Sequence, residues 1–531
     1  MIMTCVFLAA LLGEGTCGVY SPDGDSVALQ RTESGKSRVG VLNRKSGAFA
    51  WIEPGRGNAA YPAWSPSGDA IVYAYGNETN TAWAAKDGNT GCHLRIWRGG
   101  SIREITTGRF RDYMPSFSRD GGKVFFSSTR CASPEVFLAT RSGIYAVDVD
   151  DLAGTRPCRV RGNTDGSWSR PYQLAPSYVN DEGARQSFVA DGSWSRPYQL
   201  VPSHVNDEGA GQPVVSPDGK MLALAQISGF RSTWRIVCAW LSEPEWSCGA
   251  LGDRALPVCT VSPKGQSAYA PRWTPDGRHI VYTGFSKGDP GWCVYVLNPR
   301  TGGVKRICEG RNPDVHPSGA FLLYDDGVRL YERPFGADDL PSSDVVVDEE
   351  SRLYDEPERL IWRSEKPDYP ATVPMTEAFN FGTDRTFFVR AKVRYTPAAS
   401  PRFRHFLTGE YEGAKLGFEL FIDHGRPKFG ARDGDGAYMG AVSDVVLEAG
   451  HEYVLTGIRT SSALFIHVEG KSLQEMRFSA TYPLDRPIRL EIGPTVGSKG
   501  DILLGEIGTG WPTNVPHPIT RTKFFAGEGT K

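Results

Sequence analysis

A four-residue turn motif occurs six times in this 531-residue chain and restricts the fold more than any other feature. The residue types suit a tight turn, because Pro fixes φ, Asp accepts hydrogen bonds within the turn and Gly adopts positive φ. Each copy precedes an apolar, β-rich run, so each predicts two strands joined by a hairpin. The copies are SPDG at Ser21–Gly24, SPSG at Ser65–Gly68, SRDG at Ser118–Gly121, SPDG at Ser216–Gly219, TPDG at Thr274–Gly277 and HPSG at His316–Gly319.

The spacing of the motif distinguishes a propeller from other repeat folds. Pro22 and Pro66 are 44 residues apart, and Pro275 and Pro317 are 42 apart, which matches the about 40–45 residues of a four-stranded propeller blade. We therefore predict an all-β chain that begins with a six-bladed β-propeller over residues 19–345. The 98 residues from Arg119 to Pro217 equal roughly two blades, so a degenerate seventh blade there is the alternative.

These turns, the strands after them and the segment RDYMPSFS at 111–118 resemble the TolB-type, WD-like propeller repeat family. The resemblance covers about residues 19–345. It implies a propeller fold but no single function, because its members include periplasmic scaffold proteins, peptidase gating domains and polysaccharide lyases. Fold alone does not determine function in such families.

A different pattern begins after an acidic linker at residues 346–358. Alternating strands are predicted from residue 359 to residue 514, and regular turns between antiparallel strands indicate a β-sandwich of the jelly-roll type. The segments at 380–393, 463–471 and 492–508 resemble laminin-G-like or concanavalin-A-like domains, which implies either glycan binding, often with calcium, or a role as a structural spacer. Asp433 and Asp435 are weak calcium candidates, and an ordinary Asp-Gly hairpin turn is the alternative. Residues 515–531 are expected to be a C-terminal tail.

The composition and the N-terminus constrain the surroundings of the protein. The chain has 59 basic and 61 acidic residues, so no basic surface for nucleic acid is expected. No apolar run reaches the length of a membrane span. The apolar stretch Ile2–Leu12 favours a signal peptide over residues 1–18, and hence a periplasmic or secreted protein. In the alternative, residues 5–12 pair with the last blade and close the ring.

Two cysteine pairs lie at mirrored positions about predicted turns. Cys293 and Cys308 flank one turn, and Cys238 and Cys248 flank another. Directly opposite residues of an antiparallel pair are close enough for a disulfide. The sequence therefore predicts the disulfides Cys293–Cys308 and Cys238–Cys248, with buried free thiols as the alternative.

One segment of 20 residues occurs twice, at 165–184 and 191–210, with 18 identical positions. It carries aromatic and charged side chains of the kinds that stack on sugars and hold polar ligands, whereas a connecting loop is the alternative. The candidate ligand-binding residues are Trp168, Arg170, Tyr172, Trp194, Arg196, Tyr198 and His204.

No motif for nucleophilic, metal or phosphate chemistry is recognisable in the chain. We therefore expect a binding or scaffold protein without a cofactor, calcium in the C-terminal domain excepted. Its partner would be a carbohydrate or a protein, bound through the propeller funnel and the lectin-like sandwich. The alternative is a polysaccharide lyase with its active site in the funnel. Convergence of Tyr, His and Arg there would favour the enzyme.

Overall fold

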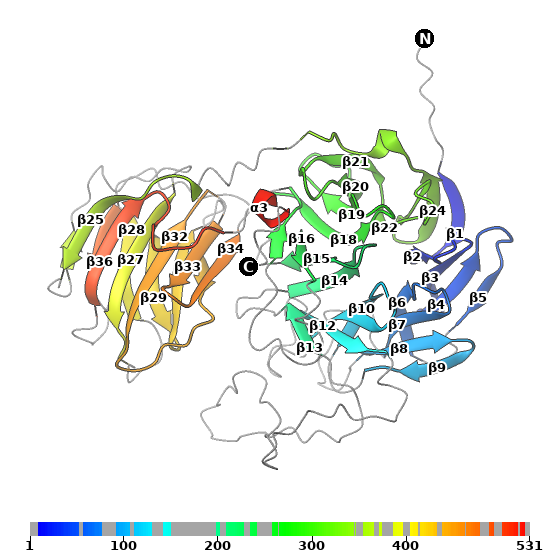
Figure 1. Ribbon diagram of the computed structural model, residues 1–531, viewed down its shortest axis with the longest axis horizontal. Coiled ribbons are helices and arrows are strands. Elements are labelled where there is room, and N and C mark those ends of the chain that lie inside the picture. The colour runs from blue at the N-terminus through cyan, green and yellow to red at the C-terminus, as the bar shows by residue number, and fades with distance from the viewer. Residues whose placement is uncertain are drawn as a thin grey trace, which may run out of the picture.

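The computed structural model is built almost entirely of antiparallel β-sheets, in two parts (Figure 1). In the first part, six four-stranded sheets are arranged around a common axis as a β-propeller, with their innermost strands in contact in cyclic order. The structure describes residues 9–52, 57–76, 92–106, 111–129, 142–149, 198–201, 209–227, 234–241, 258–263, 265–344, 346, 354–365, 371–373, 386–396, 404–411, 415–432, 438–461, 463–477, 488–492, 502–518 and 521–525.

Five of the propeller sheets follow the chain from the innermost strand outward. The first has β2 (Thr16–Tyr20), β3 (Ser26–Glu33), β4 (Lys36–Asn43) and β5 (Phe49–Trp51). The second has β6 (Asn58–Trp64), β7 (Ala70–Gly76), β8 (Cys92–Arg98) and β9 (Ser101–Glu104). The third has β10 (Asp112–Phe117), β11 (Lys123–Ser128), β12 (Gly143–Asp148) and β13 (Tyr198–Val201). The fourth has β14 (Gly209–Val215), β15 (Met221–Ile227), β16 (Arg235–Trp240) and β17 (Val258–Thr260). The fifth has β18 (Ser267–Trp273), β19 (Ile280–Phe285), β20 (Cys293–Leu297) and β21 (Val304–Glu309).

The sixth sheet joins the two ends of the propeller segment. It contains β22 (Arg311–Val315), β23 (Phe321–Asp325) and β24 (Arg329–Pro334), and its outermost strand is β1 (Ala10–Glu14), which pairs antiparallel with β24. Residues 10–14 lie in β1 and residues 16–20 lie in β2, so these strands include part of the region predicted as a signal peptide. The alternative, closure of the ring by the N-terminal segment, is the arrangement in the structure, with β1 beginning at Ala10.

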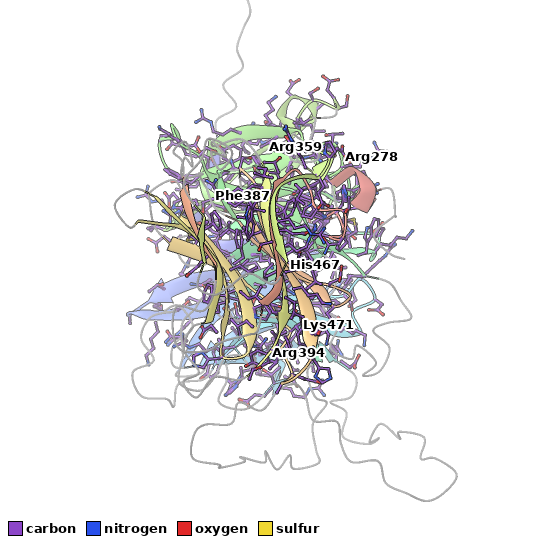
Figure 2. All side chains as sticks on the ribbon, turned by 90° about the vertical axis from the view of Figure 1, so that its left-hand side faces the viewer. Arg278, Arg359, Phe387, Arg394, His467 and Lys471 are labelled. Carbon is purple, nitrogen blue, oxygen red and sulfur yellow. The ribbon has the colours of Figure 1, made fainter. Side chains whose placement is uncertain are left out.

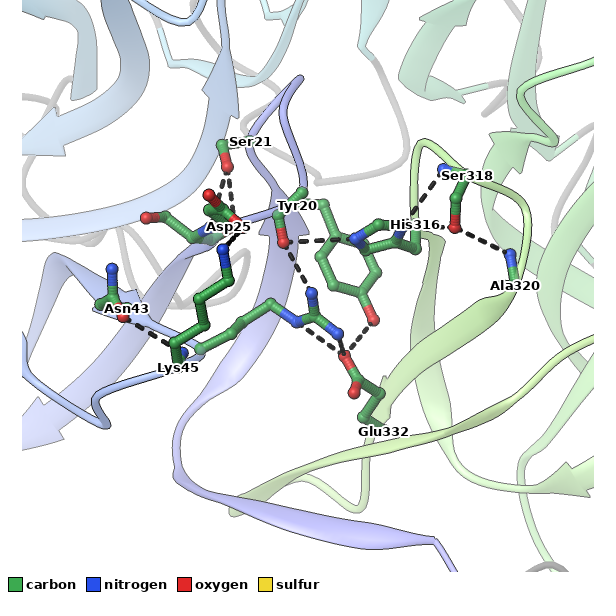
Figure 3. Close-up of polar contacts among 12 residues, drawn as sticks. Tyr20, Ser21, Asp25, Asn43, Lys45, His316, Ser318, Ala320 and Glu332 are labelled. Carbon is green, nitrogen blue, oxygen red and sulfur yellow. Dashed lines mark hydrogen bonds and ion pairs between the residues drawn. The ribbon is translucent and has the colours of Figure 1, made fainter.

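Polar contacts reinforce the junction between the sixth and first sheets (Figure 3). The Tyr20 hydroxyl donates to Glu332 Oε1 at 2.7 Å, and Arg44 forms an ion pair with the same oxygen at 2.6 Å. His316, from the sixth turn motif, lies edge-on to the Tyr20 ring at 5.0 Å. His316 therefore packs at the junction between these two sheets.

The residue before each turn motif packs between neighbouring sheets. Trp273 is 8 % exposed, and its indole N–H donates across to the Val214 carbonyl of the preceding sheet at 3.2 Å. Trp64 makes the same contact to the Val19 carbonyl, also at 3.2 Å. The repeated motif therefore encodes both the hairpin and the contact that fixes one sheet against the next.

Replacement of this anchor predicts a graded loss of stability. Trp273→Ala should lower the free energy of unfolding by about 3–5 kcal/mol, because a large buried aromatic leaves a cavity. Trp273→Phe keeps most of the apolar area and loses the hydrogen bond, so it should cost about 1 kcal/mol from that bond. Denaturant titration measures both, and an alanine variant as stable as wild type would contradict this packing role.

The structure contradicts the predicted disulfide Cys293–Cys308, since both residues are free thiols, and Cys238 is a free thiol as well. A register shift in β21 places Cys308 opposite Val294 and Cys293 opposite Glu309. One extra residue turns a side chain to the other face of a sheet, and the two cysteines pack in different apolar clusters. Cys238 lies opposite Cys259, while its predicted partner Cys248 is outside the described residues.

Thiol mapping tests this arrangement. Cys293 and Cys308 should be recovered as free thiols after denaturation and alkylation of protein made under oxidising conditions. In the native protein, burial raises the pKa of the Cys308 thiol to about 12, so its alkylation at neutral pH should be slow. A peptide containing Cys293 cross-linked to Cys308 would contradict the register of β20 and β21.

The second repeated segment contributes strands to two sheets. Its residues Tyr198–Val201 form β13, the outermost strand of the third sheet, and its last residues begin β14, the innermost strand of the fourth. The first copy is outside the described residues. The second copy is therefore part of the propeller framework at both of these points.

Two six-stranded sheets form the second part and pack face to face. One has the order β25 (Arg359–Glu365), β36 (Ile502–Thr509), β27 (Phe387–Arg394), β32 (Glu452–Arg459), β33 (Ala463–Val468) and β34 (Ser472–Arg477). The other has β26 (Ala371–Val373), β35 (Ile488–Ile492), β28 (Arg404–Tyr411), β29 (Lys415–Asp423), β30 (Arg426–Arg432) and β31 (Tyr438–Val442). Phe387, labelled in Figure 2, and Phe429 belong to the apolar core between them.

The C-terminal segment returns to the propeller. Helix α3 (Arg521–Phe525) lies beside β16, on the side of the propeller that faces the second part (Figure 1). Phe524 is completely buried in the core of the fourth and fifth sheets, and the Trp240 indole donates to its carbonyl at 3.0 Å. The expected C-terminal tail is therefore, at these residues, a packed element.

Candidate functional site in the propeller channel

Each innermost strand of the propeller has a bulge with one residue in the left-handed region. These residues are not glycines, so the conformation is strained and persists only because surrounding contacts enforce it. Five of them precede a proline, and the sixth precedes Gly18. They are Cys17 (φ 52°), Tyr61 (φ 56°), Met114 (φ 52°), Gln212 (φ 55°), Ala270 (φ 52°) and Asn312 (φ 48°).

Hydrogen bonds from one sheet to the next hold these bulges. Asp325 Oδ2 accepts from the Cys17 backbone N–H at 2.9 Å, and Thr283 Oγ1 accepts from that of Asn312 at 2.9 Å. In both cases the acceptor lies on the second strand of the preceding sheet. In the same way, Ser127 Oγ accepts from the Gln212 backbone N–H at 3.2 Å.

The bulge residue of the fifth sheet, Ala270, bonds to a side chain at a different position of the preceding sheet. In the fourth sheet, Ala225 occupies the position that Ser127 occupies in the third, because Ala225 pairs with Gly211 as Ser127 pairs with Tyr113. Alanine has no side-chain acceptor for the backbone N–H of the next bulge residue, Ala270. The Gln212 side chain accepts from the Ala270 N–H instead, at 2.6 Å. This bond uses the amide oxygen of Gln212, a residue that also lines the channel.

The bulges surround a cavity on the propeller axis. Its volume is about 40 Å³, which is room for a few water molecules, and it is partly open to solvent. Its walls are mostly proline rings and bulge residues, with one charged side chain. The lining residues are Cys17, Gly18, Tyr61, Pro62, Met114, Pro115, Gln212, Pro213, Ala270, Arg272, Asn312 and Pro313.

Arg272 is the charged residue of this lining, and the buried carboxyl groups of Asp314 and Asp325 lie near the channel. Asp314 is buried, which raises the pKa of its carboxyl to about 6, although the Arg272 charge and the hydrogen bond from the Tyr20 N–H oppose that shift. The pKa of the Cys17 thiol is raised to about 12, chiefly by burial. At neutral pH the axis therefore carries a guanidinium and a carboxylate, with a neutral thiol between neighbouring strands.

The predicted site residues lie elsewhere or outside the described residues. Tyr198 is the first residue of β13 at the outer edge of the third sheet. Trp168, Arg170, Tyr172, Trp194, Arg196 and His204, together with the calcium candidates Asp433 and Asp435, are outside the described residues. Within the described part of the chain, no group of three or more His, Cys, Asp or Glu side chains could hold a metal ion.

The channel residues have a sequence signal that the turn motif alone does not reveal. In five sheets, a proline stands three residues before the first residue of the turn, as Pro271 precedes Thr274 and Pro313 precedes His316. The residue before that proline is the strained one. The recurrence of X-Pro at this fixed offset identifies the axial ring.

Comparison with known proteins gives limited similarity. No family model matches the chain. A TolB homologue from Chlorobium luteolum is 27% identical over 118 residues, which are 22% of this chain and 24% of that protein. The chain thus matches about a quarter of this curated relative's length, and the match supports a TolB-type propeller for the first part.

Solved structures are similar only at a low level. A putative TolB from Agrobacterium tumefaciens has a TM-score of 0.36 and 14% identity over 61% of this chain and 91% of that one. An oligogalacturonate lyase from Vibrio parahaemolyticus has a TM-score of 0.38 and 11% identity over 64% of this chain and 96% of that one. Values of this size carry no argument about function. Among the described residues, no helix is long and apolar enough to cross a membrane.

The raised pKa of Asp314 predicts a pH dependence of stability. The folded protein holds the Asp314 proton more tightly than the unfolded chain, whose aspartate pKa is about 3.9. The contribution of the Asp314 carboxyl to the stability of the folded state is therefore fully present below about pH 4 and is lost as pH rises to about 6. Asp314→Asn should remove that loss, so the variant should gain stability relative to wild type between these pH values.

Asp326→Asn is the matched control with the opposite sign. Backbone hydrogen bonds, first that from Arg329 N–H, lower the pKa of Asp326, so its contribution is lost as pH falls. Free energies of unfolding, measured from about pH 2 to 7, should therefore change with pH in opposite directions: the Asp314→Asn difference from wild type changes between about pH 4 and 6, and the Asp326→Asn difference changes below about pH 4. If the free energies of unfolding of wild type and Asp314→Asn differ by the same amount at every pH, the raised pKa of Asp314 is contradicted.

Proposed function

We propose that this chain is a binding or scaffold protein that recognises glycans or a protein partner through the propeller channel and the second domain. The channel lining carries the proposal. Its proline rings, amides and single guanidinium bind and orient groups, whereas a lyase of the predicted kind would bring Tyr, His and Arg together. His279 and His316, on turns of the fifth and sixth sheets, both lie outside this lining.

The remaining parts of the proposal concern the architecture and the setting. The six four-stranded sheets are the complete set of blades, and the second domain is a laminin-G-like or concanavalin-A-like jelly roll that needs no cofactor apart from optional calcium. The protein works in the periplasm or outside the cell. The repeated segment contributes to ligand binding through Trp194 and Arg196, which precede β13 in the sequence.

Binding to the purified full chain tests the proposal. Titration calorimetry against a panel of neutral and uronic-acid glycans should give saturable binding, without formation of unsaturated products. Tyr61→Asn should weaken a ligand that enters the channel, because it removes the aromatic face and Asn tolerates positive φ. His424→Asn is the control, since His424 has a φ of 48° on an exposed turn of the second domain.

Each result has a distinct meaning. Weakening by Tyr61→Asn but not by His424→Asn supports binding in the channel. Unsaturated products formed by wild type would overturn the binding role in favour of the lyase. If no glycan binds, capture of a protein partner that depends on Tyr61 supports the protein-binding form of the proposal, and absence of both overturns it.

A further inference from the structure

We propose that Arg272 anchors the carboxylate of a linear ligand that enters the propeller channel, either a free organic acid or the acidic side chain of a bound polypeptide. This inference rests on the proposed function and names the chemical group that the channel recognises. It arises from one position at which the fifth sheet departs from the others.

Arg272 occupies an axial position that every sheet repeats. It is the second residue after the bulge residue of its innermost strand, and it pairs with Val281 of the second strand. The equivalent residues of the other sheets are Val19, Ala63, Ser116, Val214 and Asp314, which pair with the second strand in the same way. Arg272 is therefore the single cation in this ring.

The guanidinium of Arg272 has unused donors. Its hydrogen bond is to the carbonyl of its own neighbour, Pro271, at 3.0 Å, and it has no ion pair with another described residue. The nearby carboxylate of Asp314 accepts instead from the Tyr20 N–H at 2.8 Å. A half-buried guanidinium with open donors beside this cavity favours an acceptor from outside the chain.

The surrounding groups select a carboxylate on a narrow stem. The planar fork of arginine matches a carboxylate with two parallel hydrogen bonds. Gln212 lines the same cavity, and its NH₂ group is a further donor beside the oxygen that accepts from Ala270. Proline rings form the rest of the wall, so the part of the ligand behind the carboxylate should be apolar and unbranched.

Calorimetry with paired probes tests this on the full-length protein. Glutarate is compared with its neutral analogue glutaramide, and acetyl-Ala-Glu-Ala-amide with acetyl-Ala-Gln-Ala-amide. We expect the charged member to bind at least tenfold more tightly, since a hydrogen bond to a charged group contributes about 1.5–3 kcal/mol. Preference for glutarate identifies a free acid as the source, and preference for the Glu peptide identifies a polypeptide.

Arginine variants assign the effect. Arg272→Gln should abolish the difference within each pair, and Arg272→Lys should retain part of it because the charge remains without the fork. Arg278→Gln is the matched control, since Arg278 is an exposed arginine of the same sheet, labelled in Figure 2. Near-UV circular dichroism and thermal unfolding establish that each variant is folded.

The pH dependence of glutarate affinity provides a second readout, which a purely structural arginine would not affect. Asp314 and Cys17 are the titratable groups that sense the charge of Arg272. A bound carboxylate places a second negative charge near Asp314, so glutarate affinity should fall as pH rises from about 6 to 8. Asp314→Asn should remove this dependence, whereas the thiol of Cys17 stays neutral throughout.

The outcomes separate this inference from the proposed function. Equal binding of glutarate and glutaramide, together with equal binding of the two peptides, would overturn it. So would a charge preference that survives Arg272→Gln. If the inference fails while Tyr61→Asn still weakens a glycan or a partner, the channel remains a binding site with a different anchor.

Discussion

The propeller depends on a strained turn of backbone repeated six times around its axis. A non-glycine residue at positive φ costs of order 1–3 kcal/mol, yet every innermost strand contains one, from Cys17 in the first sheet to Asn312 in the sixth. The bulge turns the N–H of this residue out of its own sheet. Where the preceding sheet offers an acceptor, as Asp325 does for Cys17, the strain becomes a contact between sheets.

Contacts between sheets also close the ring, where the two ends of the propeller segment meet. Antiparallel β1 and β24 join residues more than 300 positions apart, so neither end of the propeller is an open edge. Asp325 and Asp314 of the sixth sheet both accept backbone N–H groups of the first, and Tyr20, Arg44 and Glu332 form the outer part of the junction. The burial that makes Asp314 useful there also raises its pKa.

Local chemistry made much of the fold predictable. The turn residues specify hairpins through φ and hydrogen bonding, and the region from residue 359 to residue 514, in which alternating strands are predicted, contains β25 to β36. Register was not predictable. One inserted residue in β21 separates Cys293 from Cys308, and nothing in the spacing of the two cysteines reveals it.

The site was harder to predict than the fold because its residues act through backbone geometry. The aromatic and charged residues of the repeated segment suggested a ligand site, yet Tyr198 begins a framework strand. Pro62 and Pro313 appear in the sequence to interrupt strands, but in the structure they line the axial cavity. A proline following a bulge loses no ladder hydrogen bond, since bulges are among the positions in a sheet that tolerate it.

Departure from the repeat is what gives a symmetric ring a specific site. Six equivalent bulges alone would produce a channel with the same groups on every side and no preferred orientation for a ligand. Gln212 breaks the equivalence because Ala225 offers no acceptor to the next bulge. Arg272 and Asp314 break it again by placing opposite charges at two neighbouring positions of the ring. The repeat therefore supplies the rigid frame, and the fourth, fifth and sixth sheets supply the polarity that makes one side of the channel different from the other.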